Sequence, residues 1–386
     1  YVLDSIRFGT PIHRSVPKFV FEKTPGAARL NVGDTTITLS GSDTIDLSLS
    51  PVYLTIVSSD LSTTKVYRIE MYVHQVDPDL YQWKQLSDAV YPQDDSEQQV
   101  LVLNDVFYLF ANNGYGNTLY CSLDAVKWTN KPLTGLPTTC HVRGIVGNDE
   151  QLFYASDTVL YTSFDGQLWE KQYYTDSSFH IQTMLMCYND TIWAVLEDNT
   201  QKLYLGKWHE GRICNTHIEL DDNFPISDFC AVEFLSSCER RRAMIIGGYT
   251  REGQCLNSRW NVEYSPTDLQ TPYRFVNYSI EQPSFTTLTG VSVVWYNLQL
   301  LMFGGVDAEM MYQGNEILVS SDEGFTWFRA DTTKNALPSS YSARQKQSVV
   351  VYNNNIYVIG GQGKERVYSD VYQGRLNSID WDKTTN

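Results

Sequence analysis

Short apolar runs, separated by polar turn residues, cover most of this chain. From about residue 81 one unit recurs: an apolar strand, a polar hairpin turn and a second, more strongly apolar strand. Several turns hold Asn-Asp or Asn-Asn pairs, and both residues tolerate left-handed backbone angles. The six copies of the unit are Val100–Phe110, Gly144–Ala155, Met184–Val195, Ala231–Ile246, Val291–Phe303 and Ser348–Ile359. This pattern predicts an all-β repeat structure.

Three of the copies end in a pair of glycines. The pairs are Gly247-Gly248, Gly304-Gly305 and Gly360-Gly361, and their spacing is nearly constant. Each pair follows an apolar run, so we expect it to mark the end of a buried strand. There the backbone must turn or approach a neighbour closely, which a side chain would prevent. No GxGxxG or GxxxxGK[ST] string occurs, so the pairs do not predict a phosphate site.

A turn that bears Ser and Asp, followed by Trp, comes after several copies. Its members are Ser122, Asp124 and Trp128; Ser163, Asp165 and Trp169; Ser320, Asp322, Gly324 and Trp327; and a looser version at Asn377–Trp381. We expect the Asp to accept backbone N–H bonds within the turn. The Trp should lie on the next strand and pack between sheets. These residues are therefore predicted to be structural.

The string from Ser320 to Trp327 resembles the Asp-box of sialidase-type propellers. The Gly-Gly strands, followed by Tyr368 and Trp381, resemble kelch repeats. Both families form β-propellers in which each repeat supplies one four-stranded blade of roughly 50 residues. The resemblance implies a six-bladed β-propeller over residues 81–386, with the glycine pairs as its kelch glycines.

Residues 1–80 read as a separate set of short strands. They are predicted at Lys18–Glu22, Thr35–Leu39, Val52–Val57 and Lys65–His74. In the last of these, Tyr67, Ile69, Met71 and Val73 alternate with Arg68, Glu70 and Tyr72, the period of a half-buried strand. We expect a small Ig-like or cadherin-like β-sandwich. The predicted fold is thus all-β: a small N-terminal β-sandwich followed by a six-bladed β-propeller. This layout is similar to that of exported surface lipoproteins of gut Bacteroidetes.

Outer strands are more numerous than the repeats require. Seven candidates serve six copies: the segments at Trp83, Trp128, Trp169, Trp327 and Trp381, with Gly206–Ile213 and Tyr273–Tyr278. We expect Tyr81–Leu86 to complete the last blade, because a ring that is closed by both ends of the chain hides its edges.

The charge balance excludes some partners. The 386 residues include 45 acidic and 29 basic side chains, for a net charge of −16, which repels nucleic acid and anionic membranes. No apolar run is long enough to span a bilayer. The chain begins with Tyr, so we expect a processed or truncated form, whose export signal or lipid anchor lies outside it. An exported monomer, at the outer-membrane surface or in the periplasm, is predicted.

No metal or cofactor is predicted. The seven cysteines show no CxxC spacing and the six histidines no HExxH motif. We expect mostly buried free thiols, with a bridge among Cys230, Cys238 and Cys255 as the alternative.

Candidate binding residues follow from their position in the repeat. In propellers the first residues of the inner strands surround one mouth of the channel, where ligands usually bind. These positions hold His141, Arg143, His180, Asp228 and Arg344. Such a ring could grip a carboxylate or sugar hydroxyls, since Arg makes bidentate contacts. The alternative is a water-filled channel lined by ordinary polar residues.

Three functions remain open. The first is a non-catalytic cell-surface or periplasmic binding module for a glycan or a protein. The second is a glycoside hydrolase, sialidase-like, or a lyase that uses residues at the mouth. A sialidase needs an arginine triad, whereas only Arg143 and Arg344 stand at blade starts, and the Arg-Ile-Pro signature is absent. The third is a purely structural surface protein.

Overall fold

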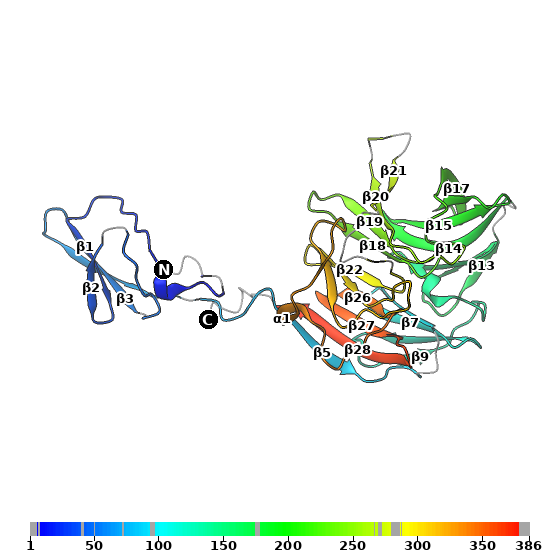
Figure 1. Ribbon diagram of the computed structural model, residues 1–386, viewed down its shortest axis with the longest axis horizontal. Helices are drawn as coiled ribbons and strands as arrows, with labels where there is room; N and C mark the ends of the chain where they lie inside the picture. Colours follow the sequence, from blue (N-terminus) through cyan, green and yellow to red (C-terminus); the bar gives the residue numbers. More distant parts are fainter. Residues whose placement is uncertain are drawn as a thin grey trace. The chain divides into compact units, whose positions relative to one another are not determined.

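The computed structural model describes residues 6, 8–39, 42–49, 51–71, 73–92, 97–173, 178–265, 267–268, 272–278, 286 and 288–377. The chain forms two compact units (Figure 1). One holds the described residues up to Leu80 together with Leu376 and Asn377, and the other holds the described residues of Tyr81–Arg375. The candidate site lies in the second unit.

The first unit contains a four-stranded antiparallel sheet in the order β2-β1-β3-β4. Its elements are η1 (Ile12–Arg14), β1 (Ala27–Val32), β2 (Thr35–Thr38), β3 (Val52–Val57) and β4 (Thr64–Ile69). Leu30, Val52 and Leu54 form part of its buried core. Strands β2, β3 and β4 begin within one residue of the predicted positions, whereas β1 was not predicted from the sequence.

Two predictions for this unit are wrong. Lys18–Glu22 is not a strand. Pro17 and Pro25 bracket it, and among the described residues no neighbouring strand pairs with it. Strand β4 ends at Ile69 instead of His74, and as an edge strand it leaves Tyr67 48% exposed. The described residues of this unit form one sheet and two isolated bridges, so the sandwich stays a prediction.

Six four-stranded antiparallel sheets make up the described part of the second unit. The first sheet contains β6 (Glu97–Leu103), β7 (Val106–Asn112), β8 (Asn117–Ser122) and β9 (Thr129–Lys131). The second contains β10 (Val146–Gly147), β11 (Leu152–Ser156), β12 (Val159–Ser163) and β13 (Glu170–Tyr173). The third contains β14 (Phe179–Tyr188), β15 (Thr191–Asp198), β16 (Leu203–His209) and β17 (Arg212–Glu219). The next two are β18 (Cys230–Leu235), β19 (Arg241–Ile246), β20 (Arg259–Tyr264) and β21 (Tyr273–Asn277); and β22 (Ser292–Tyr296), β23 (Gln299–Phe303), β24 (Ile317–Ser320) and β25 (Phe328–Arg329). The last sheet joins β26 (Ser348–Tyr352), β27 (Asn355–Gln362) and β28 (Val367–Leu376) to β5 (Tyr81–Ser87). Two short helices, η2 (Val142–Gly144) and α1 (Thr332–Asn335), lie in connections.

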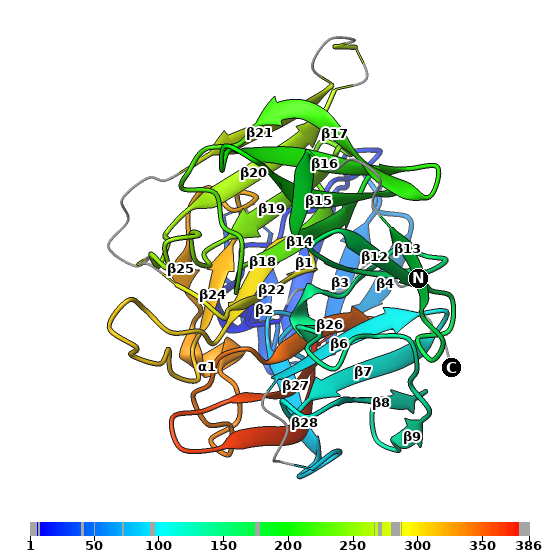
Figure 2. The ribbon, with the colours of Figure 1, turned by 90° about the vertical axis from the view of Figure 1, so that its right-hand side faces the viewer.

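The first strands of these sheets form a closed ring. Strand β6 contacts β10, and the contacts continue through β14, β18, β22 and β26 back to β6. Figure 2 shows β6, β14, β18, β22 and β26 toward the middle of the unit, and the last strands β9, β17, β21 and β25 toward its periphery. The loops that precede the first strands therefore converge.

The last sheet joins the two ends of this unit. Strand β5 is its fourth strand, which confirms the prediction that Tyr81–Leu86 completes it. The ring of Trp83 lies over Gly374 of β28, where a Cβ would come within 2.5 Å of it, and meets Phe303 edge-on. Trp381, the surplus outer-strand candidate, lies outside the described residues.

The hairpin turns have the predicted backbone. Asn104-Asp105, Asn189-Asp190 and Asn353-Asn354 all have positive φ. The turn predicted at Tyr296-Asn297 is shifted by one residue, since Asn297 and Leu298 carry the positive φ angles. Tyr273–Tyr278 contains β21, as predicted, whereas Gly206–Ile213 spans the end of β16, a turn and the start of β17.

All six glycines of the Gly-Gly pairs have positive φ. Each first glycine also faces the chain that leads to the next sheet. A Cβ on Gly247 would lie 2.0 Å from the carbonyl oxygen of Leu288, and one on Gly304 would lie 2.4 Å from that of Arg344. Both the turn and the close approach therefore require glycine, as the sequence predicted.

The three Ser-Asp-Trp turns are hydrogen-bonded in the same way. Asp322 accepts hydrogen bonds from the Thr326 backbone N–H and the Ser320 hydroxyl, both at 2.8 Å. The indole N–H of Trp327 donates to the Gly324 carbonyl at 3.1 Å. Asp124 with Trp128, and Asp165 with Trp169, make equivalent bonds. Each Trp lies just before the fourth strand of its sheet, one residue earlier than predicted.

Candidate ligand site at the end of the central cavity

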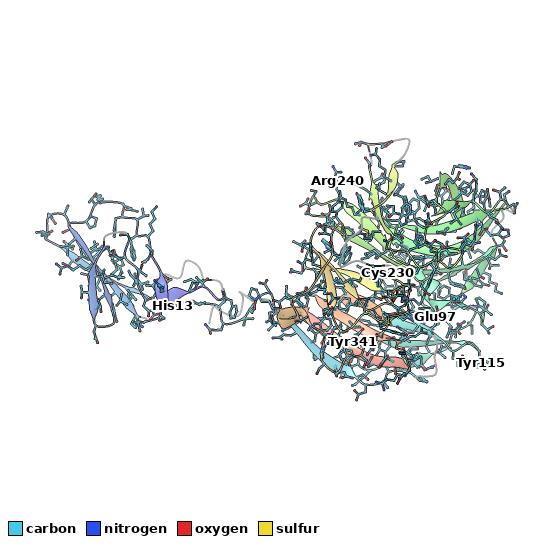
Figure 3. The ribbon with its side chains drawn as sticks, viewed as in Figure 1. His13, Glu97, Tyr115, Cys230, Arg240 and Tyr341 are labelled. Atoms are coloured by element: carbon cyan, nitrogen blue, oxygen red, sulfur yellow. The ribbon has the colours of Figure 1, made fainter. Side chains whose placement is uncertain are left out.

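A cavity of about 800 Å³ lies among the first strands of the ring. Residues of β6, β10, β14, β18, β22 and β26, and of the loops before them, line it. Glu97 and Cys230, labelled in Figure 3, belong to this lining. The strand starts bring charged side chains to the cavity, while Val100, Leu185 and other apolar residues line it further along the strands.

Three of the preceding loops share one backbone conformation. Asp228, Gly290 and Lys346 stand two residues before β18, β22 and β26, and their φ angles are 51°, 63° and 56°. The residue before each of them forms an isolated bridge with the residue that follows the Gly-Gly pair of its own sheet: Ser227 with Tyr249, Thr289 with Val306, and Gln345 with Gln362. The glycine pairs thus hold these loops in place.

Backbone hydrogen bonds connect the three loops in series. The N–H of Gly290 donates to the Asp228 carbonyl at 3.0 Å, and the N–H of Lys346 donates to the Gly290 carbonyl at 2.7 Å. The Lys346 carbonyl accepts from the Gln98 amide at 3.1 Å. The side chains at these positions are therefore presented from a rigid arc.

Asp228 lies between two cations. The Lys346 Nζ is 2.8 Å from Asp228 Oδ2, and the Arg143 Nε is 4.0 Å from Oδ1. Arg143 also donates through Nη1 to the Lys346 carbonyl at 3.1 Å. The side chains of Arg143, Asp228 and Lys346 are 13%, 20% and 23% exposed, so the group is largely removed from bulk water. All three line the cavity.

Glu97 and His141 stand beside this group. The Glu97 carboxylate accepts a hydrogen bond from the backbone N–H of Val142 at 3.1 Å, which fixes η2 and hence Arg143. Its Oε2 lies 3.8 Å from His141 Nδ1. Glu97, with a smaller contribution from Asp228, raises the pKa of His141, against the opposing effects of partial burial and Lys346. The His141 imidazole itself is largely exposed.

The structure brings three of the five predicted residues together: His141, Arg143 and Asp228 all line the cavity. His180, at the start of β14, lies at the rim, where its Nδ1 is 2.6 Å from the carboxylate of the lining residue Asp157.

Arg344 lies elsewhere. Its side chain is fully buried and pairs with both carboxylate oxygens of Asp370 on β28. The guanidinium also lies over the rings of Tyr341, labelled in Figure 3, and Tyr368, with centroid distances of 4.3 and 3.8 Å. It is not among the cavity-lining residues, and it stabilises the last sheet.

Two charged residues of the site were not predicted. They are Lys346, two residues before β26, and Glu97, the first residue of β6. Alignment of the three loops on Cys230, Ser292 and Ser348 would have placed Lys346 opposite Asp228 and Gly290. That alignment was available from the repeat spacing.

A partly buried carboxyl lies further along the cavity. Glu233, on β18, accepts a hydrogen bond from the Asn189 N–H at 3.2 Å. Burial raises the pKa of Glu233, and it also raises the pKa of the nearby Cys187 thiol to about 12. Glu233 lies on β18, five residues after Asp228 in the chain.

The structure adds three further findings on the described residues. No group of three or more His, Cys, Asp and Glu side chains there could hold a metal ion. No helix within the described residues is long and apolar enough to cross a membrane. No disulfide forms among the seven cysteines, so the bridge considered among Cys230, Cys238 and Cys255 is absent. Only Cys140 is buried, Cys238 is exposed and the other five are half-buried, so the expectation of mostly buried thiols is wrong.

Comparisons with known proteins identify the ring. The family model described as the DUF6242 beta propeller domain matches residues 77–384. Among solved structures, the one entitled "Structure of YjhT" is similar, with a TM-score of 0.54 and 11% sequence identity. The match covers 74% of this chain and 95% of that one, and at this identity it shows the fold alone. No curated protein matches the sequence.

Proposed function

Since the chain belongs to the DUF6242 beta propeller family, we propose that its propeller is a non-catalytic binding module that takes a glycan at the mouth of the cavity. The observation that carries this proposal is the convergence of Arg143, Asp228 and Lys346 on one cavity. The loops that present them are already hydrogen-bonded to one another, so a ligand would not have to order them.

The mixture of donors and acceptors suits sugar hydroxyls. A hydroxyl group both donates and accepts, so it can bridge the Asp228 carboxylate and the Lys346 ammonium. Uncharged polar side chains on neighbouring strands, among them Gln99, Gln182 and Thr183, extend the polar lining. Pockets of this kind orient a ligand through a few placed polar groups.

Glu233 favours a second candidate function, glycoside hydrolysis. A carboxyl with a raised pKa in a cavity is a candidate general acid. A glycosidase also needs a second carboxyl about 5–9.5 Å away, and the Glu233 carboxylate is already engaged by the Asn189 N–H and by Arg241, whose Nη1 lies 3.8 Å from it. We therefore rank hydrolysis second.

We propose further that the six four-stranded sheets are six blades. The shared hydrogen bonds of the Ser-Asp-Trp turns and the positive φ of the glycine pairs support the likeness to Asp-box and kelch repeats. The N-terminal unit is proposed to be an Ig-like domain. By its similarity of layout to exported surface lipoproteins, the protein is proposed to act as a monomer at the cell surface or in the periplasm.

A glycan array combined with a hydrolysis screen tests the function. We expect wild-type protein to bind a subset of glycans without turnover. Arg143→Gln should weaken this binding, while Arg274→Gln, which changes an exposed arginine on β21 that pairs with Asp268, should leave it unchanged. Turnover of any glycan, or equal binding by the Arg143→Gln protein, contradicts the proposal.

A further inference from the structure

We infer that the glycan recognised at this site ends in a sugar with one carboxylate, a uronic acid, whose carboxylate is held by Arg143 and Lys346. The inference rests on the proposed function, because it names the chemical class of ligand for the same site. Three properties of the site support it: its charge, its unused hydrogen-bond donors and its uncharged polar surroundings.

The first property is the charge of the group. Arg143 and Lys346 share the single carboxylate of Asp228. The neighbouring Glu97 is already engaged by the Val142 N–H and His141. Arg143, Lys346 and Asp228 together carry one net positive charge, although Glu97, Asp157 and Glu233 also line the cavity and the chain as a whole carries −16. A monoanion would balance it.

The second property is a set of free donors. A guanidinium has five N–H groups. In the described part of the chain, that of Arg143 makes one hydrogen bond, from Nη1 to the Lys346 carbonyl. Its Nε is 4.0 Å from Asp228, beyond hydrogen-bonding distance. No nitrogen of Arg143 is both buried and without a partner, so its remaining donors are open to the cavity, where a ligand can accept from them. A carboxylate accepts two parallel N–H bonds from Arg.

Lys346 supplies a second contact for the same anion. Its ammonium has three donors, and its one ion pair among the described residues is with Asp228. A ligand carboxylate between Arg143 and Lys346 would produce two cations and two anions in alternation. A dianion such as a phosphate monoester is disfavoured, because the carboxylates of Glu97 and Asp157 also line the cavity.

The third property distinguishes a sugar acid from a simple carboxylate. Gln99, Gln182 and Thr183 line the cavity on β6 and β14, to either side of the strand that follows Arg143. Amide and hydroxyl groups bind hydroxyls without adding charge. A ring that bears one carboxylate and several hydroxyls fits both parts of this lining.

Titration calorimetry on the full chain tests the inference. The probes are oligosaccharides that end in galacturonate, glucuronate or mannuronate, the methyl esters of the same sugars, and acetate. The esters keep every hydroxyl and remove the charge. We expect at least one free acid to bind about tenfold or more tightly than its ester, and acetate to bind far more weakly.

Variants identify the residues. Arg143→Gln should lower affinity for the free acid by about 10- to 100-fold and leave affinity for the ester within about twofold, so that the preference for the acid disappears. Arg143→Lys, which keeps the charge but not the planar fork, should lose an intermediate factor. Arg274→Gln is the control and should match wild type. An unchanged melting temperature for each variant shows that the fold is retained.

Each contrary outcome has a distinct meaning. If an ester or a neutral glycan binds as tightly as every acid, the inference is overturned while glycan binding stands. If acetate or a peptide with a free C-terminal carboxylate binds as tightly as the uronates, the sugar class is wrong. If no glycan binds, the proposed function fails as well.

Discussion

The Nζ of Lys346 lies 2.8 Å from Asp228 Oδ2, although a whole sheet separates the sheets of these residues in the ring. Gly290, at the corresponding position of the intervening sheet, has no side chain. Its N–H donates to the Asp228 carbonyl, and its carbonyl accepts from the Lys346 N–H. The ion pair therefore spans three loops and stabilises their arrangement as well as forming part of the candidate site.

This pair should be energetically coupled. Because both side chains are mostly shielded from water, a double-mutant cycle with Lys346→Met and Asp228→Asn should give a coupling of about 1 kcal/mol in urea unfolding. The Lys202–Glu219 pair, with both side chains more than half exposed, serves as the control. Lys202→Met and Glu219→Gln should show clearly weaker coupling, because water and salt screen an exposed pair. Equal couplings for the two pairs would contradict this prediction.

Gly304 should not tolerate a side chain. Its φ is 58°, and a Cβ would lie 2.4 Å from the Arg344 carbonyl oxygen. Gly304→Ala should lower the free energy of unfolding by about 2–4 kcal/mol, through backbone strain and displacement of the neighbouring chain. At Gly314 nothing lies within 4 Å of such a Cβ and φ is ordinary, so Gly314→Ala should change stability by less than about 0.5 kcal/mol. Chemical denaturation of both variants decides the point.

Asp322 should contribute to stability in a pH-dependent way. Burial raises the pKa of Asp322, but the hydrogen bonds from Thr326 and Ser320 lower it by more. The net pKa therefore lies below the ordinary 3.8. A carboxyl whose pKa is lower in the folded state stabilises the fold above the unfolded pKa, and this stabilisation is lost as pH falls through the folded pKa. Asp322→Asn should therefore cost about 1–2 kcal/mol at neutral pH.

The difference between wild type and Asp322→Asn should shrink on acidification below about pH 4. Equilibrium unfolding followed by tryptophan fluorescence over a pH series measures it. Two parallel stability curves would show that this carboxylate is not specifically stabilised in the turn.

His141 should report on the charges of the site. Glu97 and Asp228 raise its pKa above the ordinary 6.5, so the protonated form is favoured in the folded protein. The resulting stabilisation is complete below the unfolded pKa and is lost as pH rises through the folded pKa. In an NMR titration, Glu97→Gln should lower the His141 midpoint, and Asp228→Asn should lower it by a smaller amount. A midpoint that neither substitution moves would place His141 outside the field of these carboxylates.

The repeat could be predicted from the sequence because its signals are local. An Asn-Asp pair imposes its own turn, and a glycine pair after an apolar run identifies a strand end whatever lies beside it. The ring closure through Tyr81–Leu86 followed from counting outer strands. The strand predicted at Lys18–Glu22 failed for the opposite reason: an apolar segment becomes a strand only where a partner pairs with it.

The site was predicted in part. His141, Arg143 and Asp228 were found from their positions before strands, but the direction of an arginine side chain depends on partners far along the chain. The Arg344 side chain contacts Asp370 and three tyrosines, and the sequence within a few residues of Arg344 does not predict this direction. Lys346 was missed because its significance comes from Asp228, more than a hundred residues earlier in the chain.

Strand β5 gives the ring an unusual order of assembly. It leaves the ribosome before every other strand of the second unit, yet its partner β28 is the last. Until β28 is made, the backbone of β5 is unpaired. Trp83 then lacks Gly374, which covers it on one side while Phe303 meets it edge-on. Such long-range pairing slows folding, since a large loop must close before the contact stabilises anything. Once β5 has paired with β28, the ring cannot open without breaking a sheet or an interface between sheets. This closure favours slow unfolding and resistance to proteases.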